Sequence, residues 1–188
     1  MNTPEKVNEL YALLDTIQED VCVLANNAGK AHMNLIHDHS VEMCFNMVNV
    51  NINAMMFVAR YYLKKFNERW TKDHKKSCVF NVSSVGGLRA SGKLSVYCGT
   101  KAFNRLFSLG MKKEYEEYVD VLTVMPMSVK SSMNSGRYFG SILASQHARS
   151  VVNHLGWGQD ETFGHWWHCM QNNLNLFWPS AFIISRIN

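Results

Sequence analysis

The sequence predicts an α/β fold, a doubly wound parallel sheet, on three observations. Short apolar runs near residues 21–25, 78–83 and 121–125 are typical of buried strands, and helical patterns separate them. Strands that alternate with helices favour a parallel sheet with helices on both faces. The runs end in small or polar residues, and the carboxyl ends of the strands are where open α/β sheets hold their ligands.

Length and composition indicate one globular domain. The chain has 188 residues, 47% hydrophobic and 18% charged, which is enough to bury a sizeable core. The net charge is +4 and the basic residues are scattered apart from a cluster at residues 72–76, so nucleic-acid binding is not expected. The five cysteines are odd in number and lack CxxC spacing, which predicts reduced packing residues in a cytosol-facing protein.

An amphipathic helix is expected at the start of the chain. Thr3 is a candidate N-cap before Pro4, and apolar residues recur at helical spacing from Val7 to Ile17. The segment lacks the basic start and long apolar stretch of a signal peptide. The run at 21–25 follows as a strand buried on both faces, and it ends in small and polar residues where a ligand can approach the backbone.

A long helical pattern covers residues 41–66 and contains Asn49 and Asn51. A buried asparagine inside a helix is costly unless its amide is hydrogen-bonded. The two asparagines therefore cap or bend the helix, or they serve a site. The elements expected next are a loop at 67–77, a strand at 78–83, a helix over about 96–118 and a strand at 121–125.

The last third of the chain is less regular. We expect a core over residues 1–150 and a C-terminal segment, 151–188, on the substrate side or against a membrane, with a strand near 161–168. His165 and His168 lack further matching ligands, which argues against a metal site. The apolar stretch Leu174–Ile184 is too short and interrupted to span a bilayer, so it packs on the domain or lies in a membrane interface.

The residues from Tyr97 to Lys101, with Ser84 upstream, place a phenol, an ammonium and a hydroxyl together. Tyr97 and Lys101 are four apart and share a face if the segment is helical. A lysine cation favours the phenolate, which brings a phenol of pKa ~10 closer to neutral pH. A serine hydroxyl beside the same oxygen stabilises developing charge. The set suits acid/base work on a carbonyl, although a packed tyrosine beside a solvated lysine is the alternative for this motif alone.

The motifs together resemble those of the short-chain dehydrogenase/reductase family in four ordered places: Asn26–Gly29, Asn51, Ser84, and Tyr97 with Lys101. The sequence is most similar to the branch of 17β-hydroxysteroid dehydrogenases and very-long-chain 3-oxoacyl-CoA reductases, judged by the long helix after Asn51 and the aromatic, apolar tail. The resemblance implies a Rossmann-like fold that is amino-terminally truncated. The first recognisable strand corresponds to the family's fourth, and no glycine-rich turn for the cofactor pyrophosphate is present.

The resemblance implies an NAD(P)-dependent oxidoreductase that reduces a ketone, such as a steroid or a 3-oxoacyl-CoA. Tyr97 is then the acid/base, and Lys101 lowers its pKa and holds the nicotinamide ribose. Ser84 orients the carbonyl, and Asn51 secures a water of the proton relay. The residues implied to bind the NADP or NAD cofactor are Asn27, Ala28, Gly29, Tyr97, Lys101, Val129 and Ser131.

Two departures from the family leave two interpretations open. Met127 stands where the family has glycine, with Ser131 in place of a threonine, and the phosphate-binding turn is missing. The chain is therefore part of a reductase whose activity belongs to a longer chain, or a catalytically inactive binding or scaffold protein of the same fold. The resemblance implies a small apolar carbonyl substrate and is compatible with peripheral membrane contact and a homo-oligomer, at the endoplasmic reticulum membrane surface or in the cytoplasm.

Overall fold

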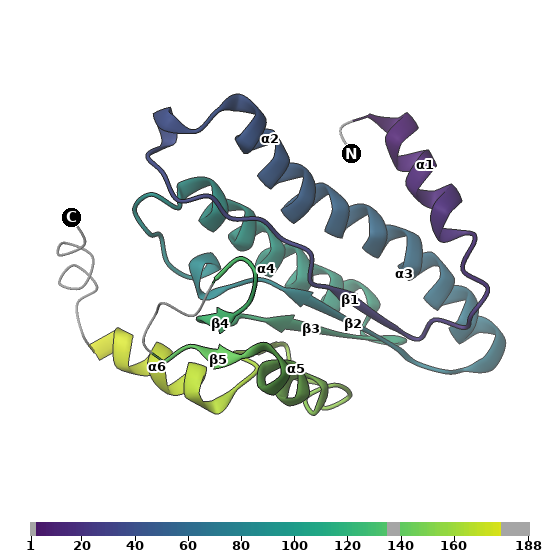
Figure 1. Cartoon of the computed structure of the whole chain (residues 1–188). Coiled ribbons are helices and arrows are strands. Elements are labelled where there is room, and N and C mark those ends of the chain that lie inside the picture. The colour runs from purple at the N-terminus through teal and green to yellow at the C-terminus, as the bar shows by residue number, and fades with distance from the viewer. Residues whose placement is uncertain (1–2, 135–139, 178–188) are drawn as a thin grey trace.

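The computed structural model describes residues 3–134 and 140–177, which form a parallel sheet with helices on both sides (Figure 1). The four strands of this sheet lie in the order β1 (Val23–Asn26), β2 (Ser77–Val82), β3 (Val119–Val124) and β6 (Glu161–Thr162). All three pairings are parallel, which confirms the predicted fold class. A short parallel pair, β4 (Val129–Lys130) with β5 (Ile142–Leu143), was not expected from the sequence.

Helices connect the strands and cover the sheet. The α-helices of the described residues are α1 (Pro4–Leu14), α2 (Val41–Val48), α3 (Ala54–Asp73), α4 (Ser95–Tyr115), α5 (Ala144–Val152) and α6 (Trp166–Phe177). The Thr3 hydroxyl accepts a hydrogen bond from the Lys6 N–H, so the predicted N-cap of α1 is confirmed.

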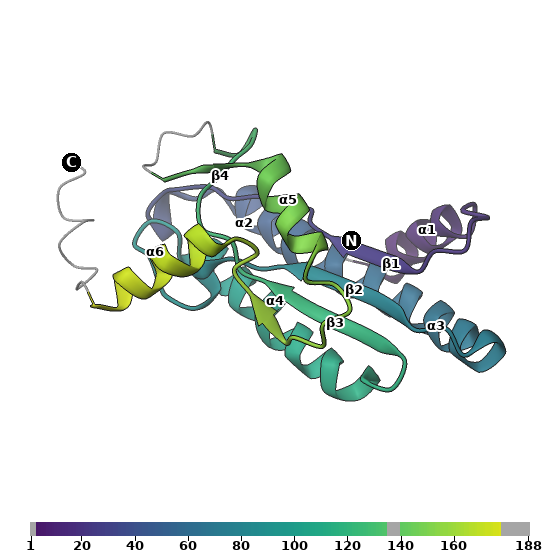
Figure 2. The same cartoon turned by 90° about the horizontal axis from the view of Figure 1, so that it is seen from below.

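Each face of the sheet has its own apolar core. On one face, Phe66 of α3 and Met111 of α4 pack in a buried cluster with Val79 and Val121. On the other face, Val151 of α5 belongs to a second cluster, with Leu122 and Val124 of β3. Figure 2 shows α5 and α6 in front of the sheet, on the side away from α3. The prediction of helices on both faces is therefore confirmed.

Strand β1 is less buried than the sequence predicted. Leu24 is buried, but Val23 is 43% exposed and the strand begins two residues later than expected. Within the described residues β1 pairs only with β2, so it forms one edge of the sheet. The prediction of burial on both faces is thus wrong for this strand, because an edge strand lacks a neighbour. Its free N–H and C=O groups can pair with another chain.

Residues 41–73 form one continuous helix with a π-helical turn inside it. The turn is Asn49–Asn53, between α2 and α3, and the Ala54 N–H donates to the Asn49 carbonyl five residues back. Such turns are frequent at functional sites. The helix extends to Asp73, so the loop predicted at 67–77 is wrong for most of its length. His74, at φ 52°, ends the helix in the left-handed conformation.

The C-terminal third differs most from the expectation. The strand predicted near 161–168 is present only as β6, because α6 begins at Trp166. β6 and Val151 lie beyond residue 150 and yet belong to the sheet and its core, although the boundary at 150 itself stays a prediction. Residues 178–184 of the predicted tail lie outside the described residues. Among the helices that the structure describes, none is long and apolar enough to cross a membrane.

Candidate active site

Most of the predicted site residues lie at the carboxyl ends of β1 and β2. Asn27 follows β1, Ser84 follows β2, and α4 carries Tyr97 and Lys101 in its first two turns. Parallel strands end at the same edge of the sheet, and a helix that starts beside this edge brings its first residues to it. The grouping expected from the strand ends is therefore the one observed.

Ser84 and Tyr97 lie close together: a Cβ at Gly86 would be 3.5 Å from Ser84 Oγ and 3.4 Å from Tyr97 Cε1. The Ser84 hydroxyl, nearly buried, also accepts from the Gly86 N–H at 3.1 Å. Burial raises the pKa of the Tyr97 phenol, and the hydrogen bond with Ser84 acts in the opposite direction. Two hydroxyl groups thus converge where a carbonyl oxygen can accept from both.

Lys101 is buried beside the Tyr97 ring, and its ammonium group is hydrogen-bonded to the backbone of β2. Its Nζ lies 5.8 Å from the ring centroid and donates to the Val82 carbonyl at 2.8 Å. Burial lowers the pKa of Lys101 to about 8. The net direction for Tyr97 is upward, opposite to the lowering expected from the lysine. The predicted lowering of the Tyr97 pKa is wrong because both groups are desolvated by burial, which the sequence does not show.

Asn51 ties the loop after β1 to α4. Its side chain is fully buried inside the π-helical turn. Its Oδ1 accepts from the Lys30 N–H at 2.7 Å, and its Nδ2 donates to the Lys30 carbonyl and to Thr100 Oγ1, both at 2.9 Å. The amide is therefore satisfied, as a buried asparagine requires. Its role in a proton relay stays a prediction.

Gly29 lies directly against the candidate catalytic groups. A Cβ at this position would be 3.4 Å from Lys101 Nζ and 3.6 Å from Asn51 Oδ1. Asn27 and Ala28 precede it and are exposed. The residues after β1 that are predicted to bind the cofactor thus lie next to the predicted catalytic residues. That Asn27, Ala28 and Gly29 bind the cofactor stays a prediction.

Val129 and Ser131 lie further along, on β4 and in the turn after it. Val129 is half-buried, while Ser131 is exposed and exchanges backbone hydrogen bonds with Asn134, at 2.8 and 3.1 Å. The contacts of the described residues do not join either one to Tyr97 or Lys101. Their predicted place beside a cofactor therefore also stays a prediction.

Thr100 and Ser83 are supporting residues that the sequence reasoning missed. Thr100 donates to the Tyr97 carbonyl at 2.8 Å and accepts from Asn51, so it links two predicted site residues. Ser83 donates to the Lys101 carbonyl at 2.6 Å. Both are buried hydroxyl residues next to motif positions, and that adjacency is the signal that could have identified them.

Gly87 packs against the backbone of α4 at Lys101. A Cβ at Gly87 would lie 2.7 Å from the Lys101 carbonyl oxygen and 2.8 Å from Ser83 Oγ. We expect Gly87→Ala to lower the free energy of unfolding by about 1–3 kcal/mol, because a backbone atom cannot move aside as a side chain does. Gly86→Ala is the matched control, since its Cβ would make only ordinary contacts. Urea unfolding of both variants checks this, and equal midpoints for the two would contradict it.

His165 and His168, considered above as metal ligands, do not form a metal site in the described part of the chain. Within residues 3–134 and 140–177, no group of three or more His, Cys, Asp or Glu side chains is arranged to hold a metal ion. His165 and His168 instead make hydrogen bonds to the backbone.

A family model described as short chain dehydrogenase matches residues 1–138. The chain belongs to the short-chain dehydrogenase family. The match covers every predicted catalytic residue. The catalytic roles of these residues stay predictions.

Several curated relatives carry names of the branch predicted from the sequence. The chain is 28% identical over 180 residues to a putative steroid dehydrogenase 4 of Caenorhabditis elegans, covering 91% of this chain and 66% of that protein. It is 31% identical over 156 residues to a very-long-chain 3-oxoacyl-CoA reductase of Laccaria bicolor, covering 79% of this chain and 44% of the relative. The chain thus spans about half to two thirds of the length of these short-chain dehydrogenase relatives.

A solved short-chain dehydrogenase shows the same fold. The enzyme from Sphingobium yanoikuyae, determined in complex with NADPH, superposes with a TM-score of 0.74 at 17% identity. The alignment covers 99% of this chain and 73% of that chain. The two chains therefore share the fold.

Proposed function

We propose that this chain carries the catalytic half of an NAD(P)-dependent oxidoreductase that reduces a ketone, with Tyr97 as the proton donor. The observation that carries the proposal is the proximity of Ser84 and Tyr97 to one another and to buried Lys101, at the carboxyl end of β2. Reducing a ketone adds a hydride to carbon and a proton to oxygen. In this proposal the proton comes from the Tyr97 hydroxyl.

The side chains have separate tasks in this chemistry. Ser84 and Tyr97 donate hydrogen bonds to the carbonyl oxygen as negative charge develops on it. Tyr97 then transfers its proton to that oxygen. Lys101, with a pKa of about 8, is still mostly protonated at neutral pH, and its charge favours the phenolate that remains. Asn51 holds the loop after β1 in place through Lys30.

The residues present fit a nicotinamide cofactor on one side of the site. Gly29 brings bare backbone to the position beside Lys101 and Asn51, so a ribose ring can approach closely. An ammonium has three donor hydrogens, and the hydrogen bond that the structure gives for Lys101 Nζ goes to the Val82 carbonyl. Bound there, the cofactor would supply the hydride. The NADPH complex of the Sphingobium yanoikuyae relative supports this choice.

Activity is tested on an extended chain, which we define as this chain with a family glycine-rich β-α segment joined before residue 1. We expect this extended chain to oxidise NADPH or NADH in the presence of a steroid ketone or a 3-oxoacyl-CoA. The relatives named as steroid dehydrogenase and 3-oxoacyl-CoA reductase support these two substrate classes. Cofactor binding without turnover of either substrate would favour a binding or scaffold protein instead.

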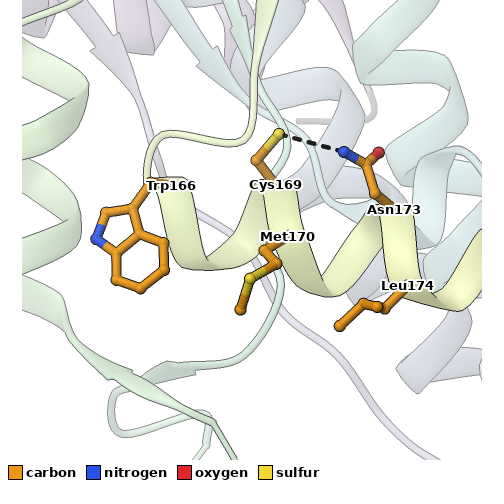
Figure 3. Close-up of a pocket in the computed structure, with 5 residues that line it drawn as sticks. All are labelled: Trp166, Cys169, Met170, Asn173 and Leu174. Atoms are coloured by element: carbon orange, nitrogen blue, oxygen red, sulfur yellow. Dashed lines mark hydrogen bonds between the residues drawn. The ribbon is translucent and has the colours of Figure 1, made fainter.

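Helix α6 supports a further part of the proposal, contact with a membrane surface. Figure 3 shows Trp166, Met170 and Leu174 along one side of the helix, where they line an open groove of ≈ 410 Å³ together with Cys169 and Asn173. Trp166 is 69% exposed and Leu174 is 59% exposed. The opposite side of α6 holds buried His168 and Asn172. The usual polarity of a surface helix is thus inverted, with apolar residues outward.

The sequence around α6 carries no Asp, Glu, Lys or Arg from residue 162 to residue 185. An apolar outward side without charges suits the headgroup region of a bilayer, where tryptophan is favoured. A surface in that position would also deliver steroid or acyl substrates. The resemblance implies the endoplasmic reticulum membrane surface or the cytoplasm, and contact of α6 with a membrane would favour the former. A homo-oligomer stays a prediction.

We expect the purified chain to float with liposomes of neutral and anionic lipid. The double variant Trp166→Ser with Leu174→Ser should reduce the floating fraction several-fold, since both side chains leave water on binding. Leu106→Ser is the control, because Leu106 is 65% exposed and lies on a different helix, α4. Flotation that the double variant leaves unchanged would mean that the outward side of α6 does not meet the membrane.

A further inference from the structure

The inward side of α6 is polar and reaches two separate loops. His168 is fully buried and Asn172 is 7% exposed. The two are four residues apart on one helix, so they lie one turn apart on the same side. Apolar residues normally occupy such positions, and two buried polar side chains there require partners.

His168 binds the backbone that follows β3. The Met127 N–H donates to its Nδ1 at 3.4 Å, and its Nε2 lies 3.2 Å from the Ser128 carbonyl. A carbonyl can only accept, so Nε2 carries the proton and Nδ1 is the acceptor. The imidazole is therefore neutral, and both of its nitrogens are used. The peptide it holds leads directly into Val129, on the predicted cofactor side.

Asn172 binds the loop that follows β2. Arg89 Nη2 donates to the Asn172 side-chain oxygen at 2.7 Å and to its backbone carbonyl at 3.3 Å. Arg89 in turn belongs to the turn that starts at Ser84, through the bond from its N–H to the Val85 carbonyl at 3.2 Å. One turn of α6 thus contacts both the loop that carries Ser84 and the loop that leads to Val129.

We propose that His168 and Asn172 are positioning residues: from one turn of α6 they hold the loops after β3 and β2 at a fixed separation. That separation decides where Ser84 lies relative to the predicted nicotinamide side. The effect of these contacts on catalysis rests on the proposed function. The contacts of His168 and Asn172 with the two loops, which we call the clamp, do not. Site groups misplaced by about 1 Å lose on the order of 10²-fold in rate, so the clamp has a direct effect on turnover.

The neutral state of His168 makes the clamp sensitive to acid. The groups facing His168 are His147 of α5, at 5.3 Å between ring centroids, and His165, at 6.1 Å, with Arg89 and Asn172 one turn along the helix. Burial lowers the pKa of His168 and of His147 below the ordinary 6.5. The unfolded chain therefore binds protons first as the pH falls. The contribution of these histidines to the free energy of unfolding is therefore full above pH 6.5 and decreases as the pH falls below it. The cause at His168 is that Nδ1 gains a proton and can no longer accept from Met127.

Hydrogen exchange of the 188-residue chain at pH 7.5 tests the proposal. We expect His168→Leu to speed exchange in residues 125–131, and Asn172→Ala in residues 84–94, each by about tenfold, because each removes hydrogen bonds at a buried position. The chain offers matched controls. His165 lies near the surface, where its Nδ1 accepts from the Trp167 N–H, and Asn173 is exposed beside Asn172. His165→Leu and Asn173→Ala should leave both loops unchanged.

Two conservative variants separate positioning from packing. In His168→Asn, the side-chain oxygen Oδ1 can take the place of the imidazole Nδ1 and should restore the protection of the Met127 amide from exchange. The Nε2 of His168→Gln can replace only the donor to Ser128 and should not. Acid should lower the protection of the Met127 amide, measured relative to its intrinsic exchange rate at the same pH, in the native chain but not in His168→Asn, since asparagine does not titrate. Exchange that is the same in all His168 variants would overturn the proposal. Slow exchange in a wild-type extended chain that has no activity would count against the proposed function alone.

Discussion

Tyr97→Phe will lower the turnover of ketone by the extended chain about 10²–10⁴-fold, while the affinity for NADPH stays within a factor of two or three. The ring remains beside Lys101, and only the hydroxyl is lost. The proton donor therefore disappears without a cavity. Steady-state rates with a steroid ketone and with a 3-oxoacyl-CoA, next to a fluorescence titration with NADPH, check both parts.

Tyr61→Phe is the control for this experiment. Tyr61 lies on α3 and donates to Asp15 at 2.5 Å, away from the site, so the same atom is removed from a phenol with no catalytic task. The control should retain full turnover. Activity that survives Tyr97→Phe would remove the phenol from the mechanism and favour the scaffold interpretation.

The second large effect concerns the cofactor. We expect the 188-residue chain to bind NADPH and NADH at least 10²-fold more weakly than the extended chain. The pyrophosphate of a dinucleotide normally lies on the glycine-rich turn at a helix amino end, and this chain has no such sequence. Hydrogen bonds to a charged group contribute about 1.5–3 kcal/mol each, and every 1.4 kcal/mol is tenfold in affinity.

Calorimetric titration of both chains measures the difference. An extended chain whose added glycines are changed to valine is the control, because it retains the added segment and loses only the close approach to phosphate. It should bind as weakly as the chain alone. Micromolar binding of NADPH by the unmodified 188-residue chain would show that a cofactor site exists without the turn.

The arrangement of the site could be predicted from the sequence because its residues follow strand ends. Ser84 ends an apolar run, and Tyr97 and Lys101 share a helix face, so topology alone brings them together. The direction of the Lys101 side chain could not be predicted. Its bond to the Val82 carbonyl depends on the depth at which α4 packs on β2, and that depth sets the pKa of both groups.

The C-terminal third was hard to predict for another reason. The aromatic run around Trp166 and Trp167 was expected to form a strand, because aromatic residues are frequent in strands. In the structure this run forms the start of α6, and the helix binds distant loops through side chains that include His168 and Asn172. Helix α5 was missed because only His147 and Val151 in it are buried. Long-range contacts of this kind leave no periodic pattern.

The π-helical turn has a consequence for how this chain tolerates changes in length. The extra residue in Asn49–Asn53 shifts the angular phase of α2 relative to α3, since each residue of an α-helix advances by about 100°. Deleting one residue there would leave an uninterrupted α-helix and preserve the core side of α3. It would also rotate Asn51 off Lys30 and Thr100. We therefore expect a single deletion to remove these contacts of Asn51 while the protein still folds. In this helix, function depends on the spacing of the residues, whereas folding depends on their identity.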